Sequence, residues 1–139
     1  MANKKMKGNN MVSFKKAMLY GFLIWLIAFA VAFLIFPIRE SNRPFFESIM
    51  PVTISIVTAF FAFKYLSKIE SNFTKEALYL GIIVIVINWL IDALIMLPPS
   101  PMQMTLSAYF QDIGFTYFMI LPITLGFGFI ANHFSQKRN

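Results

Sequence analysis

Cysteine is missing from this sequence of 139 residues, and His133 is its one histidine. The absence of cysteine excludes disulfide bonds, thiolate nucleophiles and zinc sites built on sulfur. One histidine and six scattered carboxylates do not predict a metal site. The sequence also has no ligand pattern for haem, quinone or flavin, so we expect neither a metal nor a cofactor.

Charge is scarce as well. Charged residues make up 13% of the chain, about half of the ~25% found in ordinary soluble domains. Hydrophobic residues make up 58%, including 17 phenylalanines, which is more apolar surface than a domain of this size can hide from water. We therefore expect an integral membrane protein whose main partner is the lipid bilayer.

Four apolar segments are long enough to cross a ~30 Å hydrocarbon core as helices. They cover about 17–38, 44–66, 77–97 and 109–131, and a basic tail occupies 1–16. Pro37 and Pro98 mark helix ends, whereas Pro44 suits a first helical turn. A cleaved signal peptide is the alternative for the first segment, but its apolar run continues through Phe36. The sequence thus predicts an all-α membrane protein: one domain over 1–139, an antiparallel bundle of four transmembrane helices.

The connection before the fourth span has a helix-start signal of its own. Ser100 resembles an N-cap, Pro101 a first helical residue and Gln103 the partner in a capping box. We therefore expect a short interfacial helix from about Pro101, which either bends near Gly114 or continues straight into the span. Pro122 predicts a kink within the span. An aromatic belt at the interface is expected from Tyr109, Phe110 and Tyr117.

Basic residues are distributed unevenly between the two sides of such a bundle. Five lysines lie within the first 16 residues, three lie at the loop between the second and third spans, and two basic residues follow the fourth span. The opposite side has Arg39 and Arg43 alone. The positive-inside rule therefore predicts cytosolic termini in the inner (plasma) membrane of a prokaryote. Because the basic residues flank apolar segments instead of forming a patch, we expect no nucleic-acid binding.

Small and polar residues should mark the faces where the helices meet, because lipid tails are as apolar as leucine. Each segment has such residues at alternating spacings of four and three, as in a left-handed bundle. Antiparallel threading places Ala32 and Tyr117 level with Asp92, and Ala28 and Ser55 level with Asn88. The four stripes are Gly21, Trp25, Ala28 and Ala32; Pro51, Ser55, Thr58 and Ala62; Gly81, Ile85, Asn88 and Asp92; and Tyr117, Leu121, Thr124 and Gly128.

Asp92 is the ionisable residue placed deepest in a predicted span, where a charge costs ~2.5–3.5 kcal/mol at mid-membrane. In a functional interpretation it is a proton- or cation-binding carboxylate, whose neutral form is favoured by desolvation. In a structural interpretation it is a packing group that is protonated or paired with an arginine. Tyr117 is its expected hydrogen-bond donor, and Asn88 is expected to bond Ser55 or Thr58. Asp92, Asn88, Tyr117 and Ser55 are the proton- or ligand-site candidates.

Arg39, Arg43 and Asp112 are the charged candidates at the outer face. We favour a solvated turn in which the arginines pair locally for little energy. The alternative is an arginine that reaches down to Asp92 or Asp112. Two aspartates near one membrane face also suit an intramembrane aspartyl peptidase, which shares a proton between them, but Asp112 is explained more simply by its place near a helix start.

Together these features favour a small transport-related or accessory membrane protein with an intramembrane carboxylate. Four short spans rarely enclose a full pathway, so transport would require a homo-oligomer or a larger membrane partner. A non-catalytic interaction or assembly protein is the alternative, and an aspartyl peptidase is a more remote one. We do not expect an enzyme, and no residue is assigned a catalytic role.

Overall fold

The structure is a computed structural model that describes residues 13–138, so most of the predicted basic tail lies outside the described residues. Within this part of the chain, four segments are long and apolar enough to cross a membrane: α1, α3, α4, and η1 together with α6. The predicted all-α bundle of four membrane-spanning helices is confirmed. The elements are α1 (Phe14–Leu34), α2 (Phe36–Ser41), α3 (Arg43–Leu66), α4 (Phe73–Met96), α5 (Leu106–Asp112), the 3₁₀ helix η1 (Gly114–Met119) and α6 (Ile120–Arg138).

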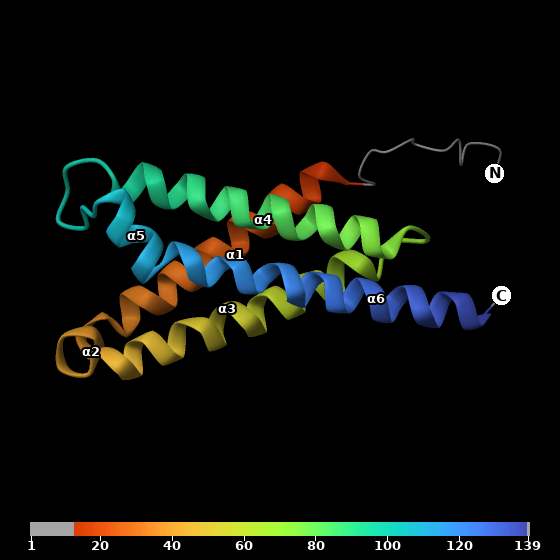
Figure 1. Cartoon of the computed structure of the whole chain (residues 1–139), viewed down its shortest axis with the longest axis horizontal. Helices are drawn as coiled ribbons and strands as arrows, with labels where there is room; N and C mark the ends of the chain where they lie inside the picture. The colour runs from red at the N-terminus through yellow and green to blue at the C-terminus, as the bar shows by residue number, and fades with distance from the viewer. Residues whose placement is uncertain (1–12, 139) are drawn as a thin grey trace.

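Successive spans run in opposite directions (Figure 1). α1 and α4 run towards the end of the bundle that carries α2 and α5, here called the α2–α5 end, and α3 and α6 run back from it. The beginning of α1 and the end of α6 therefore lie at the same end. α4 packs mainly against α1 and α6, and α3 packs mainly against the same two helices. α1 and α4 are thus parallel neighbours, as are α3 and α6.

The helix boundaries follow local signals, with some differences from the prediction. Asn42 caps α3 by accepting a hydrogen bond from the N–H of Phe45 at 3.2 Å. The first predicted span is divided into α1 and α2, with Pro37 in the first turn of α2. α4 begins at Phe73 and α6 continues to Arg138, so both extend further than predicted. These extensions are polar helix ends, whose backbone groups water can satisfy beyond the hydrocarbon core.

The expected helix start at Pro101 is wrong. The Ser100 hydroxyl accepts a hydrogen bond from the N–H of Met102 at 3.2 Å, which closes a turn at this point. The short helix α5 instead begins at Leu106. Its N-cap is Thr105, whose hydroxyl accepts a hydrogen bond of 3.2 Å from the N–H of Ala108. Ser100 therefore closes a turn instead of capping a helix, and a second hydroxyl, that of Thr105, caps the helix five residues later.

The fourth span bends at its start instead of continuing α5. The bend near Gly114 was one of the two expected alternatives, and it is the one observed, because η1 follows α5 as a 3₁₀ helix and α6 begins only at Ile120. Pro122 falls in the first turn of α6, where its missing N–H removes no intrahelical hydrogen bond. The expected kink within the span is thus replaced by the change from 3₁₀ to α-helix.

The predicted inward stripes do face the interior, since every one of their members is buried or partly buried. Glycine allows the closest approaches between helices. A Cβ added to Gly128 of α6 would lie 2.5 Å from the Cβ of Ala77 on α4, and one added to Gly21 of α1 would lie 3.3 Å from the Cα of Val84 on α4. The outward faces present large apolar side chains such as Phe33, which fits contact with lipid.

The vertical register between α1 and α4 differs from the prediction. Trp25, and not Ala32, lies level with Asp92, and Gly21, and not Ala28, lies level with Asn88. This is a shift of about two helical turns, or ~10 Å. The close contact at Gly21 explains it, because α4 can approach α1 most nearly where α1 has no side chain.

Candidate ligand cavity around Asp92

Asp92 is buried near the α2–α5 end of α4, with 2% of its surface exposed. The indole N–H of Trp25 on α1 donates to Oδ1 at 2.7 Å, and the hydroxyl of Tyr109 on α5 donates to Oδ2 at 2.6 Å. Tyr117 of η1 lies near the same carboxylate and lines the same cavity. One carboxylate therefore joins three elements that are far apart in the sequence.

The aromatic donors are held in place by their own surroundings. Trp25 stacks on Phe29, one turn further along α1, with ring centroids 4.9 Å apart. Tyr109 is 3% exposed, and its burial, together with the Asp92 carboxylate, raises the pKa of Tyr109 above its usual range. The hydroxyl is therefore a stable proton donor to Asp92 at any physiological pH.

Beside Asp92 lies a cavity of about 750 Å³. Its volume is in the range of pockets for small ligands, roughly 300–1,000 Å³. Asp92, Trp25 and Tyr117 form its inner part, and the charged side chains of Arg39, Glu47 and Asp112 also line it. The rest of the wall is mostly apolar, from residues such as Phe29, Phe33, Phe46, Met50, Ile54 and Met96.

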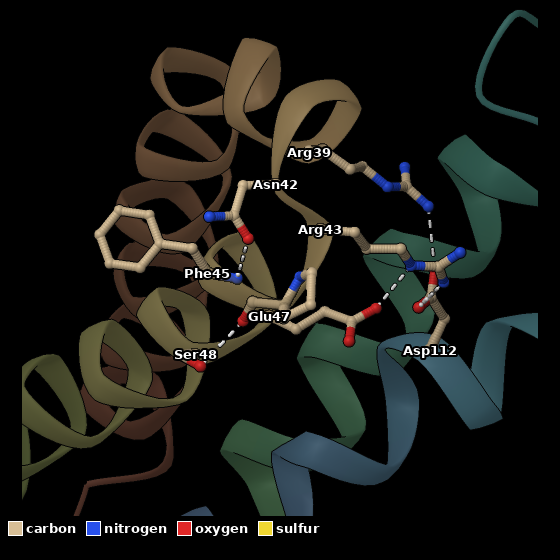
Figure 2. A network of polar contacts seen from close by, with 8 residues as sticks. Arg39, Asn42, Arg43, Phe45, Glu47, Ser48 and Asp112 are labelled. Atoms are coloured by element: carbon tan, nitrogen blue, oxygen red, sulfur yellow. Dashed lines mark hydrogen bonds and ion pairs between the residues drawn. The ribbon is translucent and has the colours of Figure 1, made fainter.

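The charged residues at the α2–α5 end form an ion-pair cluster that links α2, α3 and α5 (Figure 2). Arg39 and Arg43 each donate to one oxygen of Asp112, at 3.0 and 2.9 Å, and Arg43 also pairs with Glu47 at 2.6 Å. Only the Arg43–Glu47 pair is local in sequence. The expectation of purely local pairing is therefore wrong for Asp112, which two arginines reach across the cavity mouth. Neither arginine is bonded to Asp92, whose oxygens both have other partners among the described residues.

The two polar candidates at mid-span, Asn88 and Ser55, have other hydrogen-bond partners than predicted. The Asn88 amide donates to the carbonyl oxygens of Gly21 at 3.2 Å and Val84 at 2.7 Å, so it bonds neither Ser55 nor Thr58. Ser55 donates to a carbonyl of its own helix at 2.7 Å. The Oδ1 of Asn88 and the hydroxyl of Thr58 have no hydrogen-bond partner within the described residues. Neither Asn88 nor Ser55 is among the described residues that line the cavity.

The aspartates that a peptidase would need are engaged separately. Asp92 accepts from aromatic donors, whereas Asp112 accepts from two arginines. Aspartic peptidases require two carboxylates that share one proton. With all four carboxylate oxygens committed to other donors, this arrangement does not support shared-proton chemistry. Among residues 13–138, no three His, Cys, Asp or Glu side chains gather as a set of metal ligands.

The sequence did not indicate two of the residues that define this site. Trp25 was placed on the inward stripe of its helix without a role, and Tyr109 was assigned to an aromatic belt. For Tyr109 the sequence does offer a signal. It lies three residues before Asp112 on one short helix, so the side chains of Tyr109 and Asp112 share a helix face. No sequence signal relates Trp25 to Asp92, since their pairing depends on the register of α1 against α4.

Comparison with known proteins gives no relative from which a role could be transferred: no family model, curated protein or solved structure matches this chain. Function is therefore argued from the site itself.

Proposed function

We propose that the protein is a small transport-related or accessory protein of a prokaryotic inner (plasma) membrane that binds a ligand in the cavity beside Asp92. In this proposal the termini are cytosolic, because basic residues concentrate at the end where α1 begins and α6 ends. The cavity then lies towards the outer side of the membrane. Transport itself would require a homo-oligomer or a larger membrane partner, since four short spans rarely enclose a full pathway.

One observation carries the proposal: an intramembrane carboxylate forms part of the wall of a cavity large enough for a small molecule. A buried carboxylate is costly in a membrane, and a residue that serves packing alone is best enclosed on all sides. Asp92 instead lies beside open volume, in a mostly apolar wall with few polar groups. This combination is typical of ligand sites.

The test is binding of a neutral fluorescent amphiphile, N-phenyl-1-naphthylamine, to the protein in lipid nanodiscs. Ala32 lines the cavity, so Ala32→Phe fills part of it, whereas Ala30 is exposed on the same helix and Ala30→Phe is the matched control. We expect saturable binding above that of empty nanodiscs, lost in Ala32→Phe and retained in Ala30→Phe. Equal binding by both variants would contradict a ligand site in this cavity.

A non-catalytic interaction or assembly protein is the second candidate, and a specific observation favours it. Both oxygens of Asp92 already accept hydrogen bonds from α1 and α5, and such bonds between helices stabilise the bundle. On this interpretation Asp92→Asn lowers the free energy of unfolding, and the cavity binds no amphiphile. Measuring unfolding and probe binding on the same variants therefore separates the two candidates.

A further inference from the structure

We propose, on the basis of the ligand site above, that the cavity takes a monovalent organic cation with an apolar body, its charge directed at Asp92 between Trp25 and Tyr117. The inference deepens the proposed function by naming the chemical class of ligand. It depends on the charge of the cavity wall, on the aromatic groups around the carboxylate and on the way the arginines of the rim are engaged.

The charge of the wall is opposite to that of the chain. The whole chain has a formal net charge of +6, yet the described acidic and basic side chains that line the cavity are three carboxylates, Glu47, Asp92 and Asp112, and one arginine, Arg39. Asp112 pairs with Arg39 at 3.0 Å and with Arg43 at 2.9 Å, and Arg43 also pairs with Glu47 at 2.6 Å, so the charges at the rim are close to balanced. The excess negative charge of the wall therefore comes from Asp92, whose described partners include no cation. An apolar cavity with excess negative charge favours a cation over an anion of the same size.

The surroundings of Asp92 fit an organic cation better than a metal ion. Its described hydrogen-bond partners are an indole and a phenol, and neither is a cation that would cancel its charge. The Trp25 N–H can only donate, so Oδ1 acts as an acceptor, and each carboxylate oxygen has a second lone-pair direction to offer a ligand. Hard metal ions prefer sets of oxygen ligands, and no three His, Cys, Asp or Glu side chains gather as such a set among residues 13–138.

Aromatic side chains add an attraction that an anion would not gain. Trp25 and Phe29 stack along one wall, and Tyr117 and Phe46 also line the cavity. The faces of aromatic rings attract organic cations, by ~0.5–2 kcal/mol for each favourable contact, and more strongly where water is excluded. The apolar remainder of the wall gives the body of such a cation a surface to pack against.

The experiment compares two ions that have the same shape and opposite charge, tetraphenylphosphonium and tetraphenylborate. Each radiolabelled ion is dialysed against the wild-type protein in nanodiscs of zwitterionic lipid, and the displaceable binding to empty nanodiscs is subtracted. We expect saturable binding of tetraphenylphosphonium and none of tetraphenylborate. This comparison uses only the wild-type protein and does not depend on any variant that fails to fold.

Asp92→Asn supplies the second arm, with far-ultraviolet circular dichroism as the check on folding. Removing the carboxylate charge should weaken tetraphenylphosphonium binding by roughly tenfold or more. Ala30→Phe should bind as the wild type does, and Ala32→Phe should not bind. Equal binding of both ions, binding that survives Asp92→Asn unchanged, or no saturable binding of the cation would each overturn the inference.

The failure of this inference is distinguishable from failure of the proposed function. If the neutral probe binds in a manner blocked by Ala32→Phe while the two ions are not discriminated, the cavity is a ligand site for uncharged amphiphiles, and only the cationic class is refuted. If neither the neutral probe nor the ions bind, the ligand site itself is refuted.

Discussion

The contact between α4 and α6 at Gly128 can be tested with a single methyl group. A Cβ at Gly128 would lie 2.5 Å from the Cβ of Ala77 and 3.0 Å from the backbone oxygen of Phe73. Neither neighbour can rotate away, since one is a methyl group and the other is backbone. Gly126, two residues earlier on the same helix, has nothing beyond its chain neighbours and its own helix backbone within 4 Å of the position its Cβ would take. Gly126→Ala is therefore a matched control for Gly128→Ala.

The magnitude follows from the geometry. Carbon atoms attract best at about 3.5–4.0 Å, so α4 and α6 must separate by roughly 1 Å to admit the added methyl group. Overpacking of this kind costs ~1–3 kcal/mol, whereas replacing glycine with alanine in a helix gains up to ~1 kcal/mol at either position. We expect Gly126→Ala to be as stable as the wild type or more stable. Gly128→Ala should then be less stable than Gly126→Ala by ~1–3 kcal/mol.

The assay is reversible unfolding in mixed micelles with an increasing fraction of sodium dodecyl sulfate, followed by circular dichroism. The free energy of unfolding is extrapolated linearly for the wild type and both variants. The difference between the two variants isolates the steric effect, because the change in helix propensity is common to both. If Gly128→Ala is as stable as Gly126→Ala, α4 and α6 do not approach each other closely at this point.

Three further predictions use the same protein. Trp25→Phe removes a hydrogen-bond donor from Asp92 and should lower the free energy of unfolding by ~1–3 kcal/mol in the micelle assay, and unchanged stability would contradict the buried hydrogen bond. Asp112→Asn should cost less than ~1 kcal/mol and reduce the dependence of stability on salt, because its ion pairs are partly exposed, and a loss of several kcal/mol would be inconsistent with that exposure. Because the chain has no cysteine, Ser100→Cys should react with an impermeant maleimide in intact cells and Ser71→Cys only after lysis, and the reverse pattern would contradict the proposed orientation.

The candidate site could be predicted only in part from the sequence. The burial of Asp92 and Asn88 was predicted correctly, because a carboxylate or amide inside an apolar segment must avoid lipid. Their hydrogen-bond partners were not, since Trp25 and Tyr109 donate to Asp92 where Tyr117 had been expected. A polar side chain can be satisfied by any neighbour at the right depth, and backbone carbonyls compete with side chains. Asn88 thus bonds the carbonyl of Gly21 where a hydroxyl had been expected.

What the sequence determined by itself is the set of spans and their inward faces. A membrane requires apolar runs of a minimum length and confines polar residues to protein contacts, and both requirements can be met or violated within a single segment. The boundaries were less exact, since helix ends beyond the hydrocarbon depend on local caps such as Thr105.

Only the tertiary structure decided which residues meet around the cavity. The absence of a side chain at Gly21 sets the register of α1 against α4 and so brings Trp25 to Asp92. The late start of α5 at Leu106 places Tyr109 above the same carboxylate and Asp112 within reach of the arginines across the mouth. These pairings join positions 17 to 73 residues apart in the chain, so they depend on how whole helices pack, which no local pattern records.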